Sequence, residues 1–155
     1  MDDKQKGEIR EQFLGFLLRK RLRKTEERYR ILDTVLSFSG HFDIDTLQEA
    51  LIRSDEKFRI SKATLYNTLD LFVDAGILVP HQITSRAVQY ELKILADTHQ
   101  HLICTKCGVI REVKTQTLHL TDLKKLKITR FTPEFYCLYV YGICSKCAYR
   151  MRIKK

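Results

Sequence analysis

The sequence has no apolar run long enough to cross a membrane, because a transmembrane helix needs roughly 20 consecutive apolar residues. Its longest apolar runs are residues 13–18, which Gly15 interrupts, and residues 135–144. The first residues, Met-Asp-Asp-Lys-Gln-Lys, lack the pattern of a secretory signal peptide. We therefore expect a cytoplasmic protein with no membrane partner, in a reducing compartment where cysteines rarely form disulfides.

Motifs of common enzyme classes are also missing. The sequence contains no P-loop, no G-x-G-x-x-G and no H-x-E followed by P-C-x-x-C, the pattern of zinc deaminases. A chain of 155 residues fits one domain or two small ones and is too short for a large α/β barrel. We expect no catalytic residues, no enzymatic activity and no small-molecule substrate.

Positive charge is in excess, with 28 Lys and Arg against 19 Asp and Glu, a net charge of +9. Such a charge favours an anionic partner. The densest basic run, residues 19–24, places five positive charges in six residues and includes Arg19, Lys20 and Arg23; Arg28 follows closely. An ordinary solvated helix face is the alternative interpretation.

The first half of the chain shows three helical patterns followed by two extended stretches. We predict helices over residues 25–38 with Thr25 as the N-cap, over 45–53, and from a cap at Ser61 to a stop at Gly76. Residues 77–81 and 87–92 then predict a hairpin. Three helices and a hairpin form a winged helix-turn-helix, whose last helix enters the major groove of DNA.

The polar face of the third predicted helix carries residue types that contact bases or phosphates, namely Lys62, Thr64, Tyr66 and Asn67. A three-helix core with an ordinary polar exterior is the alternative.

Residues 93–98 look like a domain boundary. After it we predict short strands over 101–104, 109–113 and 135–141, and a lysine-rich helix over 118–126. A unit of about 60 residues of this kind needs a cross-link, such as a bound metal, or a partner chain to stay folded.

Four of the five cysteines form two C-x-x-C pairs, Cys104 with Cys107 and Cys144 with Cys147. Four thiolates in two such pairs predict a closed tetrahedral site for structural Zn²⁺. A thioredoxin-like redox pair and two disulfides are the alternatives; the first lacks its βαβ context and the second conflicts with a reducing compartment. The fifth cysteine, Cys137, lies in an apolar stretch and is expected to be a buried packing residue.

Histidine and glutamate residues before and after the first cysteine pair are further candidate metal ligands. His99 and His101 have strand spacing and so project to the same side. Glu112 follows on the next predicted strand, Glu91 ends the hairpin, and His41 follows the first helix. On spacing alone, purely structural histidines and a mixed imidazole and carboxylate metal site both remain open. Such ligands suit Fe²⁺, Mn²⁺, Co²⁺ or Zn²⁺.

The sequence resembles the ferric uptake regulator (Fur) family from about residue 22 to 147. The resemblance rests on the order and spacing of Ile-Ser-Lys-Ala-Thr-Leu-Tyr-Asn-Thr-Leu at 60–69, His-Gln-His-Leu-Ile-Cys-Thr-Lys-Cys-Gly at 99–108, and Leu-Tyr-Val-Tyr-Gly-Ile-Cys at 138–144. It implies an α+β fold in which a winged helix-turn-helix domain with an N-terminal extension, residues 1–92, precedes a small α/β dimerisation and metal-binding domain, residues 93–155. It also implies a homodimer that binds a double-stranded DNA operator.

The resemblance implies roles for particular residues. The four paired cysteines match the family's structural zinc ligands, and five residues match its regulatory metal site at the domain junction: His41, Glu91, His99, His101 and Glu112. Tyr66 and Arg23 match DNA-contacting positions, whereas Asn67 replaces a common Arg. At a further metal site of the family this chain has Thr98, Gln100, His119 and Tyr136, of which three are poor ligands, so we expect that site to be absent.

Together these patterns predict a metal-dependent transcriptional repressor that senses ferrous iron, with Mn²⁺ or Zn²⁺ as other metals for the regulatory site. A peroxide- or zinc-responsive regulator of the same family is the alternative. Peroxide sensors, however, typically have Asp where Glu91 and Glu112 stand, and zinc sensors usually have a Cys in the regulatory site, which this chain lacks. A DNA-binding protein whose C-x-x-C thiols sense oxidants without a regulatory metal is the alternative outside the family mechanism.

Overall fold

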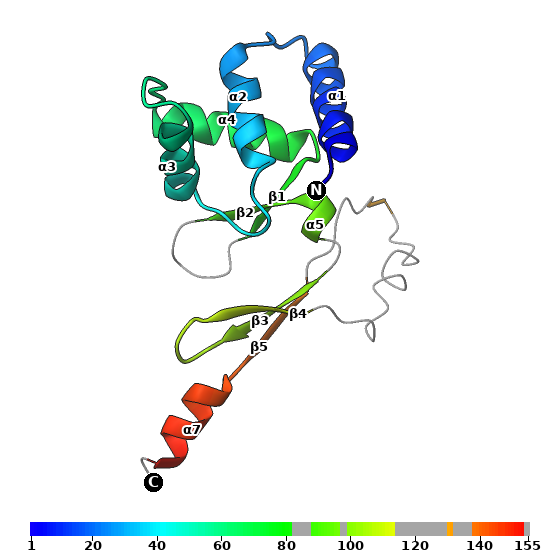
Figure 1. The fold of residues 1–155 in the computed structure, drawn as a ribbon. Coiled ribbons are helices and arrows are strands. Elements are labelled where there is room, and N and C mark those ends of the chain that lie inside the picture. The colour runs from blue at the N-terminus through cyan, green and yellow to red at the C-terminus, as the bar shows by residue number, and fades with distance from the viewer. Residues whose placement is uncertain (82–87, 97–98, 114–129, 132–137, 154–155) are drawn as a thin grey trace. The chain divides into compact units, whose positions relative to one another are not determined.

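A computed structural model describes residues 1–81, 88–96, 99–113, 130–131 and 138–153 (Figure 1). The chain divides into two compact units, unit 1 at Met1–Leu95 and unit 2 at Ala96–Lys155. Among the described residues no helix is both long and apolar enough to span a bilayer. The predicted helix at 118–126 and the predicted packing residue Cys137 lie outside the described residues.

Unit 1 begins with a long helix that the sequence patterns did not predict. Helix α1, Asp3–Arg19, starts at a capping box in which the Asp2 carboxylate accepts from the backbone N–H of Gln5. It buries only Phe13, Phe16 and Leu17. The helix was missed because its first two turns are polar and its apolar stripe is confined to one end.

The three predicted helices of unit 1 are present, and Thr25 and Ser61 are the N-caps predicted for two of them. They are α2 at Glu26–Val35, α3 at Ile44–Ser54 and α4 at Lys62–Asp74. Thr25 accepts from the backbone of Arg28, and Ser61 accepts from the backbone of Thr64 at 3.1 Å. Gly76 follows α4 with φ +69°, a left-handed conformation in which glycine carries no Cβ penalty. Helix α2 ends three residues before the predicted limit.

The predicted hairpin follows α4 and completes the layer under the helices (Figure 1). Strands β1, Leu78–His81, and β2, Gln89–Leu92, pair antiparallel with Val79 opposite Glu91. The short helix α5, Lys93–Ala96, comes next. Side chains from α1 to α4 and from the hairpin share one hydrophobic core, which includes Phe13, Leu32, Leu47, Leu69, Phe72 and Tyr90.

In unit 2 the described residues form a three-stranded sheet followed by a helix. Strands β3 (Gln100–Cys104), β4 (Ile110–Val113) and β5 (Tyr139–Gly142) lie in the order β4-β3-β5. Strand β3 runs antiparallel to β4 and parallel to β5. Helix α7, Ser145–Ile153, closes the unit. The registers place Leu102, Arg111 and Val140 on one face of the sheet, and His101, Glu112 and Tyr139 on the other.

Candidate metal centres and nucleic-acid interface

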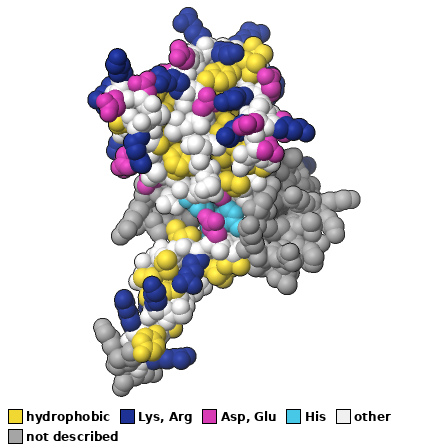
Figure 2. All heavy atoms as spheres, viewed as in Figure 1, with side chains coloured by type: hydrophobic (Ala, Val, Ile, Leu, Met, Phe, Trp, Pro, Cys, Tyr) yellow, Lys and Arg dark blue, Asp and Glu magenta, His cyan; other side chains and the backbone are white. Residues whose placement is uncertain are grey.

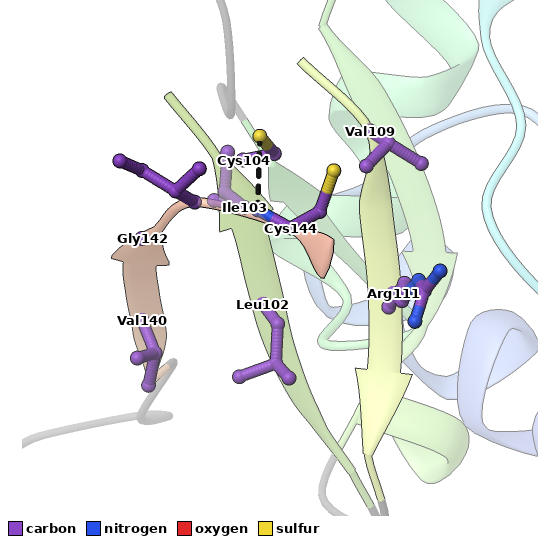
Figure 3. A pocket seen from close by; sticks show the side chains of 9 residues that line it. Leu102, Ile103, Cys104, Val109, Arg111, Val140, Gly142 and Cys144 are labelled. Atoms are coloured by element: carbon purple, nitrogen blue, oxygen red, sulfur yellow. Dashed lines mark hydrogen bonds between the residues drawn. The ribbon is translucent and has the colours of Figure 1, made fainter. Parts of the chain in front are cut away.

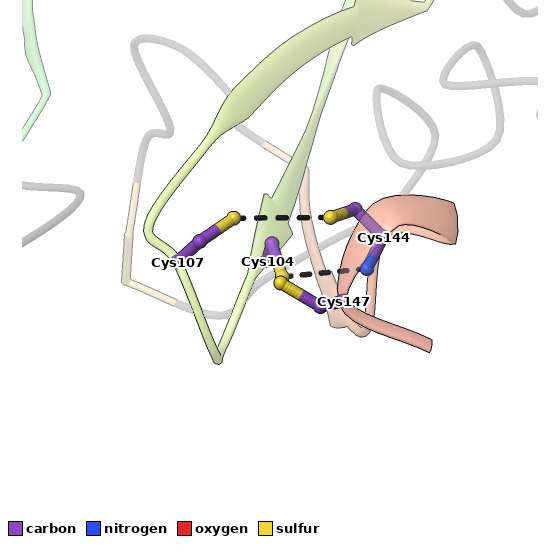
Figure 4. A group of neighbouring side chains, drawn as sticks. All are labelled: Cys104, Cys107, Cys144 and Cys147. Carbon is purple, nitrogen blue, oxygen red and sulfur yellow. Dashed lines mark hydrogen bonds between the residues drawn. The ribbon is translucent and has the colours of Figure 1, made fainter. Parts of the chain in front are cut away.

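The four paired cysteines converge at one end of unit 2 (Figure 4). Cys104 ends β3 and Cys107 follows in a turn that Gly108 closes at φ +71°. Cys144 directly precedes α7, and Cys147 lies in its first turn. The four Sγ atoms all lie within 4.8 Å of one another. The sheet and the start of α7 therefore bring together residues that are 37 to 43 positions apart across the two pairs.

The spacing of the sulfurs suits a metal ion. The Sγ atoms of Cys107 and Cys144 are 3.8 Å apart, and all four cysteines are free of disulfides. A tetrahedral zinc site with Zn–S bonds of about 2.3 Å requires sulfur pairs about 3.8 Å apart, whereas a disulfide needs about 2.05 Å. The arrangement fits structural zinc better than a pair of disulfides.

The pKa values of two of these thiols are shifted in opposite directions. Backbone N–H groups of Cys144 and Cys107 point at the Cys104 sulfur and lower the pKa of that thiol to about 6. The neighbouring sulfurs raise the pKa of Cys147 to about 12, because hydrogen bonds from the protonated thiol and like charges both oppose its ionisation. A dication at the centre of the cluster would remove this conflict and allow all four thiolates to form.

Unit 1 contributes a second set of side chains of types that can bind a metal ion. His41 precedes the bridge between Phe42 and Tyr90, and Glu91 lies in β2 with only 1 % of its surface exposed. Their closest atoms, Nε2 of His41 and Oε2 of Glu91, are 3.5 Å apart. The structure thus brings together these two predicted ligands, which are 50 positions apart in the sequence.

A third side chain, His81, lies beside these two, and the sequence patterns did not single it out. It ends β1, is almost completely buried, and places Nε2 3.4 Å from Oε2 of Glu91. Its ring also meets that of His41 with a centroid separation of 5.1 Å. The hairpin register carries the signal that could have revealed it, because His81 is two residues from Val79, the partner of Glu91, and so shares its face.

Unit 2 contributes the remaining predicted regulatory ligands. The Nε2 atoms of His99 and His101 are 3.2 Å apart, and His101 is buried. Glu112 stands directly opposite His101 in the pairing of β3 with β4 and is exposed. At the further family site, Gln100 is buried in β3, while Thr98, His119 and Tyr136 lie outside the described residues.

The predicted DNA-contacting residues differ in how free they are to bind. Tyr66 and Asn67 are exposed on α4, and Arg19, Lys20 and Arg23 are exposed around the turn after α1. Other candidates already have partners: Lys62 pairs with Asp45, Thr64 takes part in the cap of α4, and Arg28 donates to the backbone carbonyl of Arg23. Tyr66 and Asn67 are therefore the more available side chains of α4.

The net charge is divided unequally between the units. Residues 1–95 contain 16 Lys and Arg against 15 Asp and Glu, whereas residues 96–155 contain 12 against 4. Figure 2 shows charges of both signs interspersed over unit 1, whereas the charged side chains of α7 are all basic. The basic run at 19–24 is thus a local feature of a nearly neutral unit, and most of the excess positive charge belongs to unit 2.

Unit 2 also exposes an apolar face. Leu102, Val109, Val140 and Ile143 are each 38 to 48 % exposed and line a hollow of about 220 Å³ beside the cysteine cluster (Figure 3). Arg111 also lines this hollow. A contiguous apolar face on so small a unit is typical of an interaction surface.

Known proteins are similar to this chain in both sequence and fold. The model of the ferric uptake regulator family matches residues 19–141. A ferric uptake regulation protein of Bordetella parapertussis is 35% identical over 81% of this chain and 89% of the relative, and a peroxide-responsive repressor PerR of Staphylococcus epidermidis is 28% identical over 88% and 89%. The structure of the Helicobacter pylori ferric uptake regulator matches with a TM-score of 0.68 at 15% identity, covering 92% of this chain and 93% of that one.

These matches identify the α+β fold as a winged-helix domain followed by the small sheet that carries the cysteine cluster. Members of the family are transcription regulators and not enzymes. Because the family model covers residues 19–141 and the Bordetella relative is 35% identical over most of both chains, the protein is a member of the ferric uptake regulator family of metal-responsive transcriptional regulators.

Proposed function

We propose that this protein is a homodimeric repressor that binds a DNA operator when ferrous iron occupies a regulatory site made of His41, Glu91, His99, His101 and Glu112. The observation that carries the proposal is the donor set in each unit: the His41–Glu91 pair at 3.5 Å and the His99–His101 pair at 3.2 Å. Imidazole and carboxylate donors suit Fe²⁺ and similar divalent ions.

The proposed switch works by restraint. Two ligands belong to unit 1 and three to unit 2, so one metal bound by all five would limit how the winged-helix domain, residues 1–92, moves against the dimerisation domain, residues 93–155. In a two-fold dimer that restraint sets the spacing of the two α4 helices, and symmetric half-sites on DNA demand a defined spacing. Linkage then requires DNA to tighten metal binding by the same factor as metal tightens DNA binding, typically ~1–3 kcal/mol.

The structural zinc and the dimer complete the proposal. We assign Zn²⁺ to Cys104, Cys107, Cys144 and Cys147. Their sulfurs all lie within 4.8 Å of one another, and the 3.8 Å between Cys107 and Cys144 matches tetrahedral thiolate coordination. A second copy of the chain is proposed to cover the apolar face around Leu102 and Val140. The DNA contacts are assigned to Arg19, Lys20, Arg23, Arg28, Lys62, Thr64, Tyr66 and Asn67.

The test uses an operator selected from a pool of random duplexes by the Fe²⁺-loaded protein without oxygen. Fluorescence anisotropy then gives the dissociation constant for that operator with Fe²⁺, with Mn²⁺ and with chelator. We expect Fe²⁺ to tighten binding about 5- to 150-fold. The variant His99→Ala with His101→Ala should lose this gain, whereas His119→Ala, a histidine outside the proposed site, should keep it.

Three results would decide against parts of the proposal. Equal DNA affinity in Fe²⁺ and in chelator removes the co-repressor role. An unchanged metal response in the His99→Ala, His101→Ala variant removes the site assignment. Loss of DNA binding after mild peroxide treatment of the Fe²⁺ form, with structural zinc retained, would favour a peroxide sensor over a plain iron sensor.

A further inference from the structure

The proposed regulatory site leaves out His81, although this side chain lies beside one of its ligands. The His81 side chain has no exposed surface, and the Glu91 side chain is 1 % exposed. Nε2 of His81 and Nε2 of His41 lie 3.4 and 3.5 Å from the same carboxylate atom, Oε2 of Glu91. Two imidazole nitrogens thus converge on one buried carboxylate oxygen entirely within unit 1.

These separations suit a shared ion better than direct hydrogen bonds. Hydrogen bonds between nitrogen and oxygen are usually about 2.7–3.2 Å long. A divalent ion bound at about 2.1 Å in a tetrahedral arrangement holds its nitrogen and oxygen ligands about 3.4 Å apart. Both measured separations, 3.4 and 3.5 Å, agree with the second value. A cation held there would also offset the cost of burying the Glu91 carboxylate.

The fold holds the three side chains in place. Val79 pairs with Glu91 in the hairpin, so His81 and Glu91 share one face of β1 and β2. His41 is held beside this face by the Phe42–Tyr90 bridge, in which each backbone N–H donates to the partner's carbonyl at 3.0 and 2.7 Å. The T-shaped contact between the two imidazole rings follows from this arrangement.

We propose that His41, His81 and Glu91 form a metal site of their own within unit 1, with His81 as a further ligand that family resemblance did not assign. Two imidazoles and one carboxylate hold ions such as Fe²⁺, Co²⁺ or Zn²⁺ and leave positions open. The inference rests on the proposed role of His41 and Glu91 as ligands. It adds a loading step, in which unit 1 binds the metal before His99 and His101 of unit 2 complete the regulatory site.

The experiment removes the ligands of unit 2 and asks what unit 1 still binds. Full-length protein with its structural zinc retained, checked by metal analysis, carries His99→Ala and His101→Ala and is titrated with Co²⁺. Ligand-field absorption reports nitrogen and oxygen coordination, and sulfur-to-cobalt charge-transfer bands would reveal any cobalt in the cysteine site. We expect one Co²⁺ per chain, bound more weakly than in the wild type.

Adding His81→Gln to this background should weaken Co²⁺ binding at least tenfold and change the ligand-field spectrum. Gln89→Ala is the matched control, because Gln89 stands opposite His81 in the same hairpin and offers no imidazole. His81→Asn provides a second substitution should the Gln variant misfold, as judged by circular dichroism. An unchanged Co²⁺ affinity on loss of His81 would overturn the inference.

The two proposals can fail separately. If the wild type binds Co²⁺ beyond the zinc site but the His99→Ala, His101→Ala variant binds none, the unit 1 site is refuted and the regulatory site stands. If neither protein binds Co²⁺ outside the cysteine cluster, the proposed regulatory site fails and the inference fails with it.

Discussion

Replacing Phe13 by Ala should destabilise the DNA-binding unit strongly, although Phe13 lies before the residues that the family model matches. The Phe13 side chain has no exposed surface. Its ring packs edge-on against the rings of Phe72 and Tyr29, with centroid separations of 4.9 and 5.8 Å. Removing a fully buried Phe ring costs about 3–5 kcal/mol through lost burial and the cavity left behind. That is a large share of the roughly 5–15 kcal/mol that stabilises a typical domain.

Urea-induced unfolding followed by far-ultraviolet circular dichroism, with zinc present throughout, measures this loss. Leu18→Ala is the matched control, since Leu18 lies on the same helix but is 69 % exposed. We expect that control to change the free energy of unfolding by about 0.5 kcal/mol or less. If Phe13→Ala and Leu18→Ala shift the urea midpoint equally, α1 is not part of the core that holds α2 and α4.

Three further predictions follow from the caps and the cysteine cluster. Cys107→Ser should abolish stoichiometric zinc binding and unfold unit 2, because structural zinc supplies roughly 10–16 kcal/mol of apparent binding free energy; zinc retained at one per chain would contradict the assignment. Zinc binding to the metal-free protein at pH 7 should release protons, since the pKa of Cys147 is raised to about 12 while that of Cys104 is lowered to about 6. The affinity for zinc should therefore fall as the pH falls. Calorimetry in buffers of different ionisation enthalpy should show the release of protons. Ser61→Ala should cost about 1 kcal/mol, because Ser61 caps α4 by accepting from the N–H of Thr64; an unchanged melting temperature would refute this.

Features that depend on a few neighbouring residues were accessible from the sequence. The caps at Thr25 and Ser61 and the stop at Gly76 are confirmed, because each depends on hydrogen bonds or a backbone angle within one helical turn. The hairpin and the strands at 101–104 and 109–113 follow from alternating patterns of the same short range. Helix α1 was not predicted from the sequence, because its three buried residues are too few to show a helical repeat of apolar positions.

The cysteine cluster was predictable in part from the sequence and depends in part on the fold. Two C-x-x-C pairs predict a four-ligand site from spacing alone. The separation of 3.8 Å between Cys107 and Cys144, however, depends on the parallel pairing of β3 with β5, which brings residues from opposite ends of unit 2 together. Likewise, the sequence shows a basic residue at Lys62, but only the fold pairs it with Asp45 and leaves Tyr66 and Asn67 exposed on α4.

The sequence by itself determined the caps of α2 and α4, the hairpin, the paired cysteines and the family, since these depend on local hydrogen bonding and on the order of motifs. Only the tertiary structure decided that α1 belongs to the core and that His81 joins His41 at the Glu91 carboxylate. The physical reason is that a ligand set is made by strand register and packing, which place side chains 10 to 50 positions apart on one face. No local pattern around His81 carries that information.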